Sequence, residues 1–170
     1  LYLENAMDKL EEVGIDWATL TIANAKTGAI VGSASTPSFD PNKLNITDYN
    51  NPLVSYTYEP GSTMKIYSFM AAIDTGNYNG SDLYDSGNIV VDDYVISDWN
   101  RKGWGKISYD VGFTYSSNVA AVKLAEKVGK DKLVEYYEKF GFGSKTGIEL
   151  SNELSGKLDF FYKSELASAS

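Results

Sequence analysis

Apolar residues spaced three or four positions apart predict helices in several parts of the chain. The first dozen residues carry this pattern, and Gly14 interrupts it. Residues 64–75 also carry it, with almost no polar side, before Gly76 ends the run. A helix that is apolar nearly all round is normally buried on several sides, so we expect this of residues 64–75.

Further helices are predicted in the second half of the chain. Residues 119–128 and 131–140 each place apolar side chains on one stripe, and a glycine follows each of them. A shorter helix is predicted over residues 108–115. Ser108 stands at its start, where a serine side chain can cap the free backbone N–H groups.

Alternation of β-prone and small residues predicts a β-hairpin near the N-terminus. Its strands are residues 17–23 and 29–34, joined by an Asn-Ala-Lys-Thr-Gly turn at residues 24–28. Two short β-like runs follow at residues 89–91 and 94–96.

The segment between the hairpin and the apolar helix, residues 36–57, is rich in Pro, Asn, Asp and Ser and predicts a long surface connection. One hairpin is marginal alone, whereas the 64–75 helix requires cover on several sides. We therefore expect further strands beyond Ser170. We interpret residues 1–170 as the N-terminal portion of a domain. The sequence lacks a start methionine, and we expect it to be part of a longer protein.

Composition narrows the possible functions. The chain has 170 residues with 43% hydrophobic content, enough for one sizeable core. Its 15 basic and 23 acidic residues give a net charge of −8, which argues against nucleic acid or an anionic membrane surface as partner. There is no histidine or cysteine, so nitrogen or sulfur ligands for a metal are lacking, and we expect no cofactor. No apolar run approaches the roughly 20 residues of a membrane span, and no signal peptide is visible.

The same missing residue types restrict nucleophilic catalysis. A Ser-His-Asp triad needs an imidazole and a papain-like site needs a thiol. What remains is Ser62-Thr63-Met64-Lys65, which offers a serine with a lysine one helical turn away. Residues i and i+3 of a helix share a face, with β-carbons about 5–6 Å apart. At a helix start, Ser62 would lie in a field that favours negative charge, and apolar neighbours would disfavour the charged form of Lys65. This spacing also arises by chance in many proteins.

A second polar cluster, Ser116-Ser117-Asn118, stands at the start of the predicted 119–128 helix. One interpretation is helix capping, for which Ser and Asn are preferred. The other is that the cap fixes the backbone while Ser116 and Asn118 point into a cleft. The two are compatible.

Together, S-x-x-K and S-x-N form two thirds of the signature of penicillin-binding proteins and serine β-lactamases. The surrounding segments sharpen this match, and the sequence resembles the transpeptidase domain of class B penicillin-binding proteins over nearly its whole length. The segments are Tyr58-Glu59-Pro60-Gly61, Ile96-Ser97-Asp98-Trp99, Tyr115-Ser116-Ser117-Asn118-Val119 and Phe140-Gly141-Phe142-Gly143.

The resemblance implies a fold, a reaction and a set of roles. The fold is α/β and β-lactamase/transpeptidase-like, an antiparallel sheet flanked by helices plus a mainly helical subdomain. The reaction is peptidoglycan D,D-transpeptidation through an acyl-serine, with Ser62 as the nucleophile that D-Ala-D-Ala stem peptides and β-lactams acylate. Lys65 matches the base, Ser116 the proton relay, and Asn118 the side chain that holds Lys65 and the substrate amide. Trp99 matches a groove-lining aromatic, although it could equally be a core residue.

Lys145-Thr146-Gly147 spells the third motif of the signature, K-T-G. In the family, the catalytic motif of that kind lies much further along, on the strand beside the nucleophile helix. Here it follows Phe140-Gly141-Phe142-Gly143 and precedes Ile148-Glu149-Leu150, which matches a separate turn-and-strand stretch. We therefore interpret Lys145 as structural. The catalytic K-S/T-G is expected beyond the C-terminus, in a remaining C-terminal segment without which residues 1–170 would be a poor catalyst.

Further members of the acyl-serine class stay open. A class A β-lactamase needs a glutamate that activates the deacylating water, and the surroundings of Glu149 and Glu153 do not resemble its loop. A D,D-carboxypeptidase is possible, although residues 59–65 favour the class B enzymes. A penicillin-sensing receptor domain, which belongs to a different functional class, would use the same serine. A purely structural domain is disfavoured because Ser62, Lys65, Ser116 and Asn118 are intact. The resemblance further implies an extracytoplasmic location, a membrane anchor before residue 1, and the cell-division or elongation machinery as partner.

Overall fold

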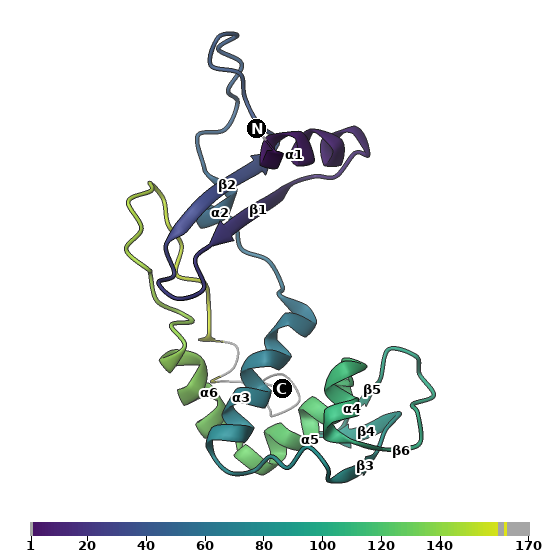
Figure 1. Ribbon diagram of the computed structural model, residues 1–170. Helices are drawn as coiled ribbons and strands as arrows, with labels where there is room; N and C mark the ends of the chain where they lie inside the picture. The colour runs from purple at the N-terminus through teal and green to yellow at the C-terminus, as the bar shows by residue number, and fades with distance from the viewer. Residues whose placement is uncertain (1, 160–161, 163–170) are drawn as a thin grey trace. The chain divides into compact units, whose positions relative to one another are not determined.

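The computed structural model describes residues 2–159 and 162, which fold as two compact units (Figure 1). The first unit consists of the chain up to residue 58 together with residues 147–154. The second unit consists of residues 59–146 and the described residues after 154. No helix in the described part is long and apolar enough to cross a membrane.

The first unit contains the predicted N-terminal helix and hairpin. Helix α1 (Tyr2–Glu12) packs on the antiparallel strands β1 (Ala18–Ala23) and β2 (Ile30–Thr36). The Asn24 side chain accepts hydrogen bonds from the Lys26 and Thr27 amides, which closes the turn between the strands. These elements confirm the sequence-based prediction.

The segment predicted as a connection also contains a helical turn, which the sequence prediction missed. Helix α2 (Pro52–Ser55) begins after Asn51, whose side chain caps it by accepting from the Leu53 amide at 3.0 Å. Four residues are too few to show an apolar period, although Asn-Pro is a typical helix start.

The second unit holds the helices on which the polar motifs lie. A 3-10 turn, η1 (Gly61–Met64), leads into α3 (Lys65–Asp74), which packs against α5 (Asn118–Val128) and α6 (Lys130–Lys139) (Figure 1). The predicted helices at 64–75, 119–128 and 131–140 are therefore confirmed within one or two residues at each end.

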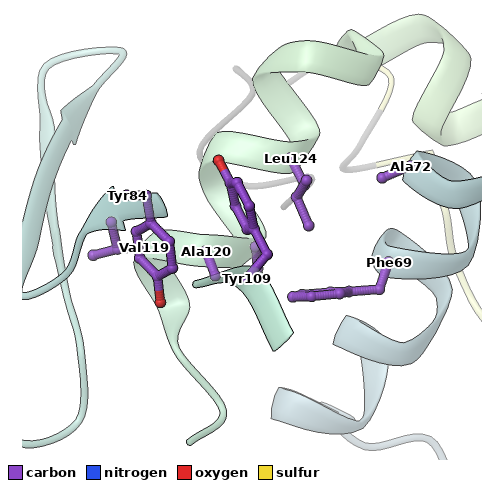
Figure 2. Packing of buried hydrophobic residues seen from close by; sticks show 8 residues of the cluster. Phe69, Ala72, Tyr84, Tyr109, Val119, Ala120 and Leu124 are labelled. Atoms are coloured by element: carbon purple, nitrogen blue, oxygen red, sulfur yellow. The ribbon is translucent and has the colours of Figure 1, made fainter. Parts of the chain in front are cut away.

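The core of the second unit lies between α3, α4 (Tyr109–Thr114) and α5. Figure 2 shows Phe69 and Ala72 of α3, Leu124 of α5 and the stacked rings of Tyr84 and Tyr109 in this cluster. Ser108 caps α4 by accepting from the Val111 amide, as predicted. This packing fixes α3 and α5, whose N-terminal ends carry the two motifs.

Two small antiparallel sheets lie beside these helices. Strands β4 (Asn88–Val91) and β5 (Tyr94–Ser97) match the predicted β-like runs, and two aspartates with positive φ form the turn between them. Strands β3 (Leu83–Asp85) and β6 (Lys106–Ser108) were not predicted. Three residues are too few for an alternating pattern to be recognised.

Helix α3 departs from the expectation that it is buried on several sides. Its buried side chains face α5 and α6, but Ile66, Met70 and Ile73 are 50%, 44% and 57% exposed. The described residues therefore cover one side of α3 and leave an apolar face open.

Gly112 provides a direct test of how tightly α4 packs. A β-carbon at this position would lie 2.4 Å from Tyr84 Oη and 3.0 Å from two ring carbons. We predict that Gly112→Ala destabilises the protein by about 1–2 kcal/mol, because overpacking outweighs the better helix propensity of alanine. Tyr84→Phe in the same background should recover part of this loss, measured as the free energy of unfolding. Additive effects of the two substitutions would contradict the predicted clash.

Candidate active site

Ser62 lies at the start of the α3 helical segment, as the sequence predicts. Gly61 has φ +58°, a left-handed conformation that glycine adopts without strain, and the chain then enters η1. Ser62 is in this 3-10 turn and is exposed, whereas Lys65 is the first residue of α3 and is only 8% exposed. The hydroxyl is therefore accessible while the amine beside it is enclosed.

The amine of Lys65 contacts Ser62, Ser116 and Asn118, the other three defining residues of the two motifs. Its Nζ lies 3.2 Å from Ser62 Oγ, 3.1 Å from Ser116 Oγ and 2.6 Å from Ser116 O. It also contacts Asn118 Oδ1 at 2.5 Å. The structure thus brings together the four residues that the sequence motifs indicated, across more than 50 positions of the chain.

Burial is the main influence on the protonation of Lys65. Desolvation lowers the pKa of its amine, and the negative charge of Asp98 opposes this more weakly. The four oxygen atoms around Nζ belong to uncharged groups, so none of them forms an ion pair with it. A lysine in this environment gives up its proton more readily than a solvated one, as a general base must.

Ser116 adopts an unusual backbone conformation, with φ +54°. A residue with a β-carbon in this region carries strain of about 1–3 kcal/mol and persists only when its surroundings hold it there. Its neighbour Ser117 caps α5 by accepting from the Ala120 amide at 3.0 Å. The capping interpretation is therefore confirmed, with Ser117 as the cap, and the side chains of Ser116 and Asn118 both contact Lys65.

The buried carboxylate of Asp98 accepts hydrogen bonds from the segment that carries Ser116. It is 1% exposed, and its Oδ1 accepts from Ser117 Oγ at 2.8 Å and from the Val119 amide at 3.1 Å. Its Oδ2 accepts from the Gly87 amide at 2.8 Å. A buried carboxylate is tolerable when donors surround it in this way.

Trp99 is 71% exposed, so it does not belong to the core that the described residues form. Its indole N–H donates to Tyr115 O at 3.0 Å, and its ring packs edge-on against Trp104, which in turn packs on Tyr115. Three aromatic side chains therefore lie beside the Ser116 loop. The substrate-binding role predicted for Trp99 remains a prediction.

A pocket of about 110 Å³ opens between η1, α3, α4 and the Ser116 loop. Ser62, Lys65 and Ser116 contribute its polar groups, and Ile66, Phe69 and Phe113 contribute apolar walls. Among the described residues, no cluster of Asp and Glu has the arrangement of a metal site. The pocket therefore brings two hydroxyls and an amine together in a partly desolvated space.

Comparison with known proteins identifies the family. The model of the penicillin binding protein transpeptidase domain matches residues 18–170. The chain belongs to this family. Among relatives of the transpeptidase-domain family, stage V sporulation protein D of Bacillus subtilis is 40% identical over 162 residues, covering 92% of this chain and 25% of that protein. Peptidoglycan D,D-transpeptidase MrdA of Escherichia coli K12 is 30% identical, covering 83% and 25%.

Solved structures confirm the fold class predicted from sequence. Penicillin Binding Protein 2X from Streptococcus thermophilus superimposes with a TM-score of 0.87 at 33% identity, covering 99% of this chain and 26% of that one. A protein titled peptidoglycan glycosyltransferase from Burkholderia ambifaria gives 0.81 at 21% identity, covering 98% and 49%, and supports the fold alone. The chain spans about a quarter of the length of the curated relatives it matches.

The K-T-G sequence at residues 145–147 lies in no helix or strand, whereas the S-x-x-K and S-x-N motifs lie at the starts of helical segments. Lys145 is exposed and belongs to an irregular segment after α6, and Gly147 has φ +79°. The stretch 148–150 forms no strand, contrary to the turn-and-strand expectation. The expectation that Lys145 is structural stays a prediction.

The parts played by Asp98 and Ser117 were not predicted from the sequence. Both residues were inside segments that resemble the transpeptidase-domain family, but neither was selected as a site residue. A carboxylate between a β-prone run and a tryptophan is a weak signal, since the sequence does not show that it is buried. Its contact with Ser117 joins positions 19 apart and depends on the fold.

Proposed function

We propose that the chain forms the nucleophile-bearing portion of a peptidoglycan D,D-transpeptidase, a serine enzyme that β-lactams inhibit covalently. The observation that carries this proposal is the position of Lys65 Nζ, within 3.2 Å of both Ser62 Oγ and Ser116 Oγ. An ammonium would offer three hydrogens to these oxygens. A neutral amine offers two hydrogens and a lone pair, and that lone pair can accept the Ser62 proton.

The first half of the reaction is acylation. Ser62 Oγ attacks the carbonyl carbon between the two D-alanines of a stem peptide while its proton moves to Lys65 Nζ. The C–N bond then breaks, and Ser116 Oγ passes a proton from Lys65 to the departing amine of the terminal D-alanine. The product is an ester on Ser62. The Ser62 amide, in the first turn of a helical segment, would stabilise the oxyanion in part.

The second half restores the serine. The amine of a second stem peptide attacks the ester carbonyl, loses a proton to Lys65 through Ser116, and forms the cross-linking amide as Ser62 regains its proton. A β-lactam acylates Ser62 in the same way, but its opened amine stays tethered and hinders the second attack. Asn118 orients both Lys65 and the substrate amide, and Trp99 would line the groove.

The resemblance to class B penicillin-binding proteins also implies a further catalytic segment, a membrane anchor and a cellular location. A remaining C-terminal segment would supply the catalytic K-S/T-G strand and complete the oxyanion hole. The protein would act outside the cytoplasm, anchored by an N-terminal membrane helix and serving cell division or elongation. In support, the relatives include proteins named peptidoglycan D,D-transpeptidase and penicillin-binding protein.

The test uses the full-length protein with a fluorescent penicillin and, separately, with synthetic stem peptides that end in D-Ala-D-Ala. We expect an acyl-enzyme that persists for many minutes and a cross-linked peptide product. Rapid turnover of the penicillin would instead indicate a β-lactamase. Release of D-alanine without cross-linking would indicate a carboxypeptidase, and acylation without any peptide product would indicate a receptor domain.

A further inference from the structure

The segment 97–99 makes a hydrogen bond to almost every residue of the loop that carries Ser116. Ser97 O accepts from Asn118 Nδ2 at 2.7 Å, and Trp99 Nε1 donates to Tyr115 O at 3.0 Å. Between them, Asp98 accepts from Ser117 Oγ and the Val119 amide. We call residues 97–99 the clamp. It holds the loop on both sides of Ser116.

Asp98 is the anchor of this clamp in the protein interior. Its second carboxylate oxygen accepts from the Gly87 amide, and its own amide donates to Gly87 O, each at 2.8 Å. The carboxylate is thus tied to the start of β4 on one side and to the Ser116 loop on the other. A planar carboxylate with three donors leaves the loop little freedom to rotate.

The loop requires such restraint because its conformation is strained. Ser116 has φ +54°, which a residue with a β-carbon leaves unless neighbouring contacts hold it. In this conformation both its carbonyl and its hydroxyl face Lys65 Nζ, at 2.6 and 3.1 Å. Relaxation of the backbone at Ser116 would withdraw both groups, so Lys65 Nζ would lose two of the three contacts by which residues 116–118 hold it beside Ser62.

We propose that Asp98 is a positioning residue for catalysis: through Ser117 and Val119 it holds Ser116 in the strained conformation that places Lys65 against the nucleophile. Asp98 does not itself reach the reacting atoms. The proposal rests on the proposed acyl-transfer function and adds to it a residue outside the S-x-x-K and S-x-N motifs.

The first variant is Asp98→Asn in the full-length protein. The amide keeps the shape of the carboxylate but turns an N–H₂ group toward either Gly87 or the loop, so one side of the clamp loses its acceptor. We expect the rate constant of acylation by a fluorescent penicillin to fall about 100-fold, the effect of a misplacement of about 1 Å. The dissociation constant of the non-covalent complex should stay within about twofold of wild type, because the pocket walls are unchanged.

Two substitutions at helix caps distinguish a positioning role of the clamp from a general loss of stability. Ser117→Ala removes the cap of α5 together with the bond to Asp98, whereas Ser108→Ala removes the cap of α4 alone. Both should lower the melting temperature, Ser117→Ala the more, because it also removes a buried hydrogen bond to a carboxylate. We expect acylation to slow about tenfold in the Ser117 variant and to stay at the wild-type rate in the Ser108 variant.

Crystal structures of wild type and Asp98→Asn provide a readout that does not depend on activity. We expect positive φ at Ser116 in wild type and relaxation to negative φ in the variant. Wild-type acylation rates in both the Asp98 and Ser117 variants, or an unchanged Ser116 in the Asp98→Asn crystal, would overturn the positioning role. If Asp98→Asn does not fold, the acylation rates of Ser117→Ala and Ser108→Ala test the positioning role instead. A wild-type protein that penicillin never acylates would overturn the proposed function, whereas the Ser116 conformation in the two crystals would still report on the clamp.

Discussion

Ser62→Ala in the full-length protein is expected to abolish covalent labelling by a fluorescent penicillin, with the acylation rate at least about 10⁴-fold below wild type. The other hydroxyl beside Lys65 Nζ is that of Ser116, which belongs to the loop before α5 and has the proposed role of proton relay. Without Ser62 Oγ there is no atom to form the ester, so loss of labelling should be close to complete. The rate is measured by quenching samples at intervals and quantifying label on a gel.

Ser68→Ala is the control for this substitution. Ser68 lies two turns further along the same helical segment, is buried, and shares a hydrogen bond of 3.0 Å with Tyr137 Oη. Its loss should cost about 1 kcal/mol of stability and leave acylation unchanged. Labelling of Ser62→Ala at a rate within tenfold of wild type would show that another residue is the nucleophile.

Lys65→Met is expected to slow acylation by about 10²–10⁴-fold, the usual contribution of a general base. Methionine fills much of the volume of the lysine stem but cannot accept the Ser62 proton. In wild type the rate should rise with pH as the Lys65 amine becomes neutral. Because burial lowers the pKa of this amine, the rise should occur below the pH at which a solvated lysine titrates. The variant should lack this rise.

Lys145→Met tests the other lysine that belongs to a motif-like sequence. Lys145 is exposed after α6, so its replacement should leave both the rate and the pH profile within about twofold of wild type. The assignment of the base would be wrong if Lys145→Met, rather than Lys65→Met, removed the pH-dependent rise without unfolding the protein.

The sequence was sufficient to predict most of the helices, the N-terminal hairpin and four residues of the site. Periodic apolar positions and terminal glycines define the elements 64–75, 119–128 and 131–140 because each extends over several turns. The spacing of Ser62 and Lys65, and the place of Ser116 and Asn118 before a predicted helix, made them candidates. Their roles were assigned from the resemblance to class B penicillin-binding proteins.

The structural features that the sequence did not predict depend on contacts between residues far apart in the chain. The β3 and β6 strands are three residues each and pair across the whole intervening β4–β5 hairpin. The positive φ of Ser116 and the burial of Asp98 follow from packing of the loop on the 97–99 segment, not from a local propensity. Helix α3 shows the reverse case: its apolar sequence predicts burial on several sides, while the described residues cover only the side facing α5 and α6.

The position of the covalent adduct tests the central claim most directly. The full-length protein is incubated with a penicillin, digested with a protease, and the peptides are analysed by mass spectrometry. We predict one modified peptide, with the opened β-lactam attached to Ser62. An adduct on any other residue, or no adduct under conditions in which the protein is folded, would contradict this assignment.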